Sequence, residues 1–141
     1  MQLPTCLQKP NLVRRNEALY YRAKAYTKQK ADKKAMEDYR ELAKDTRNPY
    51  GAEAKYQVAQ SLYDAKEYAA AEKELLNYIE QSTPHAYWLA RSFILLSDVY
   101  HATGKNLDAR QYLLSLQQNY QGNDDIESMI ESRLSKLKVE N

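Results

Sequence analysis

The residues of this sequence that could do chemistry are few, and the closest pair of them is Asp98 and His101. Three residues apart on a helix, the two side chains would share one face and could form half of a metal site or of an acid–base pair. The other histidine, His85, stands sixteen residues before His101, so no converging set of ligands is predicted. We therefore expect both histidines to be surface or groove residues, and we expect no metal site.

The remaining candidates for catalysis or cofactor binding are weak. Cys6 is the single cysteine, so an intrachain disulfide is excluded, and no histidine lies near it in the sequence to activate a nucleophile. Asp124 and Glu127 lack the alternating oxygens and central glycine of a calcium loop, and their spacing predicts a capping box instead. The sequence has no glycine-rich phosphate loop, serine elbow or paired-cysteine motif. We expect a protein without catalytic residues or cofactor.

Basic residues gather in the first third of the chain. Residues 1–50 carry twelve Lys and Arg against six Asp and Glu, whereas the remainder carries nine against thirteen. Lysines between Lys28 and Lys34 lie near Tyr20, Tyr21 and Tyr26, which is a composition that RNA-binding surfaces use. Interleaved acidic residues and a net charge of only +2 favour a solvated basic face over a nucleic-acid site.

The elements that must position these residues are predicted to be helices. Hydrophobic residues make up 43% of the chain, with three Gly and four Pro, and thirteen Tyr against one Phe supply much of the apolar bulk. Periodicity and capping signals predict about seven helices: one from 11 to about 29, others from 32, 49, 67, 84 and 124, and a sixth in chain order that holds Leu107 to Tyr120. The Asn48-Pro49 and Thr83-Pro84 pairs mark two starts, and Gly104 marks an end. The fifth helix is predicted to be the longest and to be covered on two sides.

A repeat runs through these helices. Five positions recur with an offset of 36 and then of 38 residues. The three sets are Ala23, Tyr26, Ala35, Tyr39 and Leu42; Ala59, Leu62, Ala71, Leu75 and Tyr78; and Ser97, Tyr100, Ala109, Leu113 and Leu116. Such a period is typical of stacked helical hairpins, in which small residues lie where two helices cross.

The pattern resembles the tetratricopeptide repeat family, whose motif asks for small residues at two of these positions and large ones at the others. The resemblance implies an all-α fold, a right-handed superhelix of antiparallel helical hairpins. Its repeats would cover about 16–49, 52–85 and 90–123, with a capping helix at 124–138, in one domain over residues 1–141. Lys30 and Lys66 stand where the motif prefers a turn glycine. The long period is similar to that of bacterial cell-envelope members.

The resemblance also implies a function: a non-catalytic adaptor that binds a peptide or protein segment in the concave groove of its first helices. Mapped onto this sequence, the groove would present Tyr20, Lys24, Tyr56, Gln60, Tyr63, Arg91, Asp98 and His101. The Lys and Asn pair with which chaperone-docking members clamp a terminal carboxylate is not matched here. A mixed-charge groove lined with tyrosines suits an extended or helical segment.

An alternative is that the chain is the terminal segment of a longer repeat array or a self-associating module. The predicted seventh helix would seal the C-terminal end, whereas residues 1–9 predict no helix to cover the first hairpin. The uncovered first hairpin would then be the contact surface of a homo-oligomer. No apolar run approaches the roughly 20 residues that span a bilayer, so no membrane insertion is expected. We expect a cytoplasmic protein by default, or a periplasmic one if the chain belongs to a longer exported protein.

Overall fold

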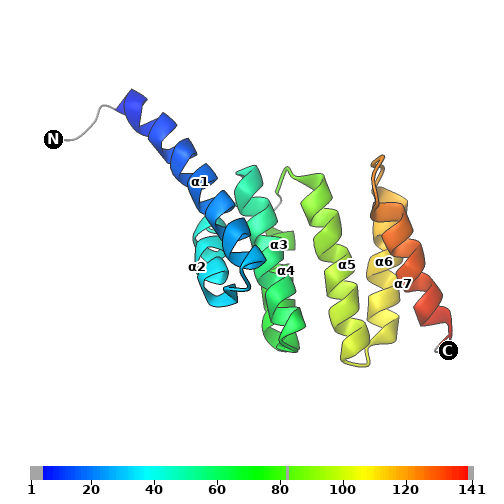
Figure 1. Cartoon of the computed structure of the whole chain (residues 1–141). Coiled ribbons are helices and arrows are strands. Elements are labelled where there is room, and N and C mark those ends of the chain that lie inside the picture. Colours follow the sequence, from blue (N-terminus) through cyan, green and yellow to red (C-terminus); the bar gives the residue numbers. More distant parts are fainter. Residues whose placement is uncertain (1–4, 82, 140–141) are drawn as a thin grey trace. The chain divides into compact units, whose positions relative to one another are not determined.

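The computed structural model describes the backbone of residues 5–81 and 83–139 and the side chains of residues 13–81 and 83–137. Within those residues the chain forms seven α-helices and no strand, which confirms the predicted all-α class (Figure 1). The helices are α1 (Thr5–Lys28), α2 (Asp32–Leu42), α3 (Pro49–Asp64), α4 (Tyr68–Glu80), α5 (Ala86–Ala102), α6 (Asn106–Asn119) and α7 (Ile126–Val139).

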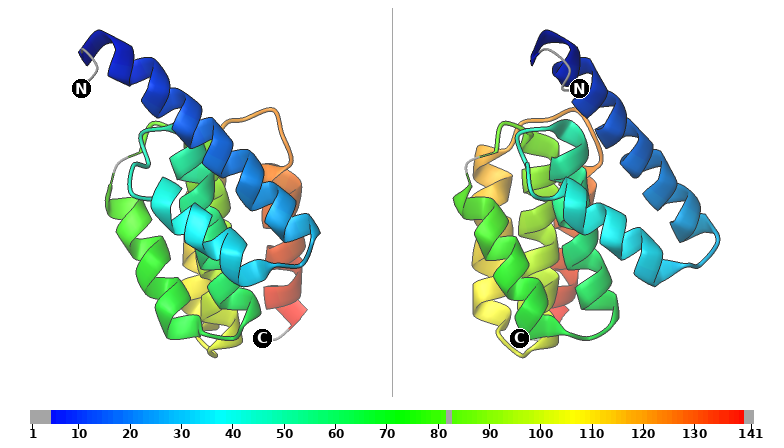
Figure 2. Two further views of the ribbon diagram at one scale, coloured as in Figure 1. Left: turned by 60° about the vertical axis from the view of Figure 1, so that its left-hand side comes forward. Right: turned by 90° about the vertical axis from the view of Figure 1, so that its left-hand side faces the viewer.

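The chain divides into two compact units, Met1–Lys55 and Tyr56–Asn141. In the first unit α1 packs against α2 as a hairpin (Figure 2). In the second unit α5 packs against α4, α6 and α7, and α7 also contacts α6. Helix α5 is therefore covered on more than one side, as predicted, and eight of its 17 residues are buried. The single domain over residues 1–141 stays a prediction.

The repeated positions form the core of the hairpins. Fourteen of the fifteen are buried, and the exception, Tyr26, is half-buried beneath the cationic groups of Arg22 and Lys34. The small residues at the predicted crossings have almost no exposed surface: Ala23, Ala35, Ala59, Ala71, Ser97 and Ala109 are each 0–4% exposed. The register drawn from the sequence therefore matches the observed core.

The three hairpin turns have the same backbone geometry. Lys30, Lys66 and Gly104 adopt left-handed φ angles of 61°, 63° and 81°. The next residue in each turn donates its N–H to a carbonyl five residues back, over 2.8 Å to Tyr26, 2.9 Å to Leu62 and 2.7 Å to Tyr100. This is the Schellman arrangement that ends helices, and it recurs with the offsets of the repeat. The lysines thus replace glycine without changing the turn.

Three helix starts, those of α1, α5 and α7, differ from the prediction by two residues or more, and one helix length differs as well. Helix α1 begins at Thr5 rather than after Pro10, because the missing N–H of Pro10 removes one backbone bond from a 24-residue helix without ending it. Helix α5 begins at Ala86 rather than Pro84. The Thr83 hydroxyl accepts the His85 N–H over 3.3 Å, which makes a turn ahead of the helix. The longest helix is therefore α1, not α5.

The joint between α2 and α3 combines a cap with a close backbone approach. Asn48 Oδ1 accepts the Tyr50 N–H over 2.8 Å, which confirms the predicted cap at the start of α3. A Cβ atom on Gly51 would lie 1.8 Å from the Asp45 carbonyl oxygen and 2.7 Å from that of Leu42. Only glycine therefore fits where α3 passes the end of α2.

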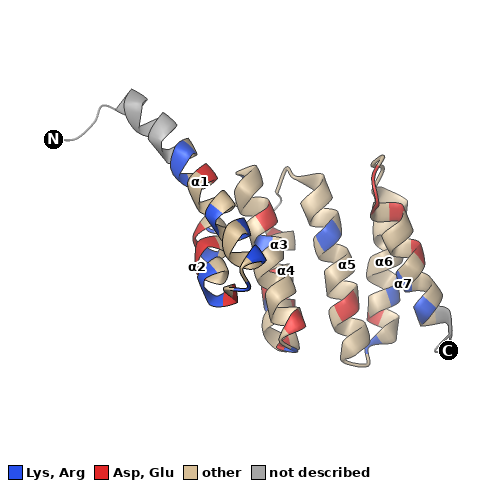
Figure 3. Ribbon diagram, in the orientation of Figure 1, with Lys and Arg blue, Asp and Glu red and all other residues tan. Residues whose placement is uncertain are grey.

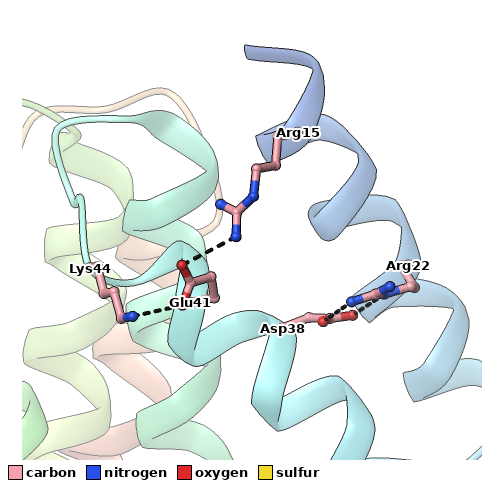
Figure 4. A network of polar contacts seen from close by, with 5 residues as sticks. All are labelled: Arg15, Arg22, Asp38, Glu41 and Lys44. Atoms are coloured by element: carbon pink, nitrogen blue, oxygen red, sulfur yellow. Dashed lines mark hydrogen bonds and ion pairs between the residues drawn. The ribbon is translucent and has the colours of Figure 1, made fainter. Parts of the chain in front are cut away.

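Ion pairs join the two helices of the first hairpin, where basic and acidic residues occur on both α1 and α2 (Figure 3). Arg22 donates two hydrogen bonds, of 2.8 and 2.7 Å, to the buried carboxylate of Asp38 (Figure 4). Glu41 accepts from Arg15 at 3.3 Å and from Lys44 at 2.7 Å. The Arg22 contact satisfies both oxygens of a carboxylate that has left water, and it therefore fixes α1 against α2.

Helix α7 closes the second unit with one apolar stripe. Ile126, Ile130 and Leu137 are 0–5% exposed, and Met129 and Leu134 are half-buried. Asp124 Oδ1 accepts the Ile126 N–H over 3.0 Å, which makes a turn just before α7, whereas the predicted capping box needs a bond to the Glu127 N–H. The predicted seventh helix thus covers α5 and α6.

Changing the turn residues should alter stability with opposite signs. Lys66→Gly removes the Cβ that strains the left-handed backbone at this position. It should therefore raise the free energy of unfolding by about 0.5–1 kcal/mol. Gly104→Ala should lower it by about 1 kcal/mol, since the added Cβ meets nothing within 4 Å and only the backbone is strained. Urea unfolding measures both, with Lys66→Ala as a nearly neutral control. Equal effects of Lys66→Gly and Lys66→Ala would contradict the turn geometry.

Enlarging a crossing residue tests the register. Ala59 is 0% exposed, so Ala59→Leu should overpack its hairpin and lower the free energy of unfolding by roughly 1–3 kcal/mol. Ser61→Leu, two residues along on the exposed face of α3, should change it by less than about 0.5 kcal/mol. Thermal unfolding of the two variants compares them directly. An unchanged melting temperature for Ala59→Leu would refute the assigned crossing.

Candidate functional site

The eight predicted groove residues divide between the two units. Tyr20 and Lys24 belong to the first unit, and the other six belong to the second. Each unit brings its own members into contact with one another and with residues that the sequence did not single out. Three groups of side chains result, one in the first unit and two in the second.

In the first unit, Tyr20 and Lys24 share the buried carboxylate of Glu53. Tyr20 donates its hydroxyl to Glu53 Oε1 over 2.8 Å, and Lys24 Nζ lies 3.0 Å from Oε2. The Lys24 ammonium also lies 4.9 Å from the centre of the Tyr20 ring, and Tyr50 packs its ring against Tyr20 at 4.7 Å. Burial raises the pKa of Tyr20. The polar ends of both predicted groove residues are therefore already engaged within the unit.

In the second unit, Arg91 is enclosed by aromatic rings. Its guanidinium carbon lies 4.9 Å from the ring centre of Tyr56 and 5.8 Å from those of Tyr87 and Trp88. It donates to the hydroxyls of Tyr56 over 3.1 Å and Tyr87 over 2.9 Å, while its Nε is buried without a hydrogen-bond partner among the described residues. Tyr87 in turn donates to Asp125 over 3.0 Å.

Tyr56 lies beneath the surface of this second unit. It is 5% exposed, and its hydroxyl, besides accepting from Arg91, donates to Gln60 Oε1 over 2.9 Å. Gln60 in turn donates a hydrogen bond from Nε2 to Asp64 Oδ1 over 2.9 Å. Burial raises the pKa of Tyr56. Tyr56 and Arg91 thus lie below the surface, and a chain of hydrogen bonds runs from them through Gln60 to Asp64.

The other four predicted groove residues meet at one hollow of about 340 Å³ in the second unit. Three helices line it: α3 with Gln60 and Tyr63, α5 with Ser97, Asp98 and His101, and α7 with Arg133, Lys136 and Leu137. This volume lies near the lower end of the range for ligand pockets, about 300–1,000 Å³. The hollow is therefore large enough for one or two side chains of a bound segment.

Asp98 and His101, the pair that the sequence singles out, each contact a further side chain. Asp98 accepts two hydrogen bonds of 3.3 Å from Arg133, through Nε and Nη2. His101 Nδ1 lies 3.0 Å from Asn106 Oδ1 at the start of α6. In the described part of the chain, no three His, Cys, Asp or Glu side chains converge as metal ligands would. The chemistry that the hollow offers is hydrogen bonding and charge.

Sequence reasoning missed Arg133 and Lys136. The seventh helix was given only the role of a cap, although these two residues flank its buried stripe at Ile130 and Leu137. The signal lay in that spacing: a residue beside the stripe of a packed helix emerges at the edge of the helix contact. There it lies next to the inner face of α5, with which α7 packs.

Comparison with known proteins gives no family. The chain matches no protein-family model and no curated protein. The resemblance to tetratricopeptide repeats therefore rests on the repeat positions and on the three equivalent turns. None of the helices in the described residues is both long and apolar enough to cross a membrane.

The tyrosines predict a loss of stability in alkali. Burial raises the pKa of Tyr20, Tyr56, Tyr63, Tyr100 and Tyr120, and the value for Tyr120, which also donates to Asp124, reaches about 12. An unfolded tyrosine titrates near 10. Between about pH 10 and 12 the unfolded chain therefore holds fewer protons than the native one, so rising pH favours unfolding, whereas below 10 the contribution is fully present.

Urea unfolding at pH 8, 9.5 and 11 measures this effect. The free energy of unfolding should be similar at the first two values and should fall at the third. Tyr120→Phe should show a smaller fall from pH 9.5 to 11 than the wild-type chain. Identical slopes for the two proteins would show that Tyr120 does not contribute.

Proposed function

We propose that this chain is a non-catalytic adaptor of the tetratricopeptide type, which binds a segment of a protein partner at the hollow between α3, α5 and α7. The observation that carries the proposal is the convergence of Gln60, Tyr63, Asp98 and His101 on that hollow. These four residues are among those that the resemblance to the tetratricopeptide family assigns to its groove.

The character of the lining supports a binding role. The hollow combines a half-buried ring at Tyr63, amide and imidazole hydrogen-bonding groups, and charges of both signs. Aromatic rings supply contact area at little cost in conformational entropy, and the polar groups fix the orientation of what is bound. The aromatic layer around Arg91 and Tyr56 holds the lining helices in place from within.

The proposal is tested by photo-crosslinking in native cells. A photoreactive amino acid replaces Tyr63 in the hollow or, as a control, Lys73 on the exposed face of α4. We expect one polypeptide to be captured from position 63 and not from position 73, with the crosslinks confined to a single segment of it. Capture from position 73 alone would place the partner elsewhere and overturn the assignment.

Affinity for the captured segment gives the second readout. Tyr63→Ala should weaken binding about tenfold or more if the ring is a central anchor. Tyr21→Ala, which removes a ring that is 63% exposed and outside the hollow, should leave binding within about twofold. Tyr63 is a sharper target than Tyr56, because truncating the buried Tyr56 ring would also disturb the core.

A further inference from the structure

We infer that the hollow recognises an acidic side chain, Asp or Glu, of the bound segment, and that Arg133 and Lys136 of α7 hold it. This inference rests on the proposed function and names the chemistry of its partner. The argument follows from the charges that line the hollow and from the geometry of the ion pair within it.

The hollow is a local reversal of charge. Residues 56–141 carry eight Lys and Arg against twelve Asp and Glu, so the second unit is acidic as a whole. The lining nevertheless contains two cations, Arg133 and Lys136, against the single carboxylate of Asp98. Lys136 is exposed, and no ion pair joins it to a described residue. A negatively charged group brought here meets an excess of positive charge.

Arg133 is held loosely enough to share. Both of its hydrogen bonds to Asp98 measure 3.3 Å, whereas charge-assisted bonds of this kind are usually about 2.7–2.9 Å. The Arg22–Asp38 pair in the first unit, at 2.7 and 2.8 Å, shows the tighter form. Arg133 uses Nε and Nη2 for Asp98, which leaves Nη1 to donate to a second carboxylate. Asp98 thereby orients the guanidinium, and its negative charge offsets part of the positive charge in the hollow.

The surroundings strengthen the attraction and select a peptide. Leu137 is 5% exposed and Tyr63 is half-buried, so the lining includes apolar surface from two helices, and a charge placed against it is less screened than in open water. An excess of one positive charge suits one carboxylate on a segment that also offers apolar contacts. A nucleic acid, which gains affinity by neutralising many phosphates, would find only this one excess charge and a competing Asp98.

The test uses a random library of 12-residue peptides displayed on phage and selected against the full chain. We expect the selected peptides to share an Asp or Glu at a fixed distance from an apolar residue. A fluorescein-labelled selected peptide and its Asn or Gln counterpart are then compared by fluorescence anisotropy. The wild-type chain should prefer the acidic peptide by about tenfold or more.

Lys136→Glu is the decisive variant, since an exposed side chain can be changed without disturbing the core. It should abolish or reverse the preference for the acidic peptide, while Lys73→Glu, the same charge change on α4, should leave it intact. Arg133→Gln should reduce the preference as well. A preference that stays within twofold of wild type in Lys136→Glu would overturn the inference.

The outcomes separate this inference from the proposed function. Selected peptides that are neutral but lose affinity with Tyr63→Ala would refute the acidic subsite and keep the binding role. Peptides unaffected by both Tyr63→Ala and Lys136→Glu, or a library without any binder tighter than about 100 μM, would count against both. A single-stranded RNA that displaces the peptide and binds more tightly in a Lys136-dependent way would assign the hollow to nucleic acid.

Discussion

Two helices can lie close together only where their side chains are small, and this constraint sets the rest of the structure. Ala23, Ala59 and Ser97, each 0–1% exposed, mark that place on the first helix of each hairpin. Once the crossing is fixed, the chain must reverse within three residues. A left-handed residue, followed by a residue that donates its N–H to the carbonyl five positions back, achieves this in all three turns. Two of these turns place a lysine rather than a glycine in the left-handed conformation.

The same constraint decides which residues reach the hollow. Gln60 and Tyr63 directly follow Ala59 and Leu62, and Asp98 and His101 directly follow Ser97 and Tyr100. One step along a helix turns a side chain by about 100°, from the crossing contact toward the open side. The lining of α3 and α5 is thus a consequence of the core register, and a residue can be replaced at the lining position without altering the packing that aims it.

Periodicity therefore predicts the hairpins and their core positions, because burial repeats with the helix, whereas the groove residues follow from the resemblance to the family. It fails where a local signal has two physical solutions. Thr83-Pro84 can cap a helix or make a turn before one, and Pro10 can begin a helix or sit within it; the sequence pattern is the same in each case. The sequence gives no sign that position 51 must be glycine. A side chain there would clash with the carbonyl oxygens of Leu42 and Asp45, which only the fold brings near. The cations of α7 flank a buried stripe, which indicates an edge position, but whether that edge faces solvent or the hollow depends on how α7 docks.

Two arginine–aspartate pairs show how one kind of contact serves different ends in this chain. Asp38 is buried and receives two short bonds from Arg22, so both of its oxygens are satisfied and the pair has little left to give another molecule. Asp98 and Arg133 keep 22% and 30% of their side-chain surface in water, and their bonds are longer by about half an ångström. A partly exposed pair of this kind loses little free energy when a ligand competes for the guanidinium. Water and the ligand can replace the hydrogen bonds and the charge that Asp98 supplies. Proximity to a hollow, partial exposure and long bonds together distinguish an ion pair that can exchange partners from one that fastens two helices.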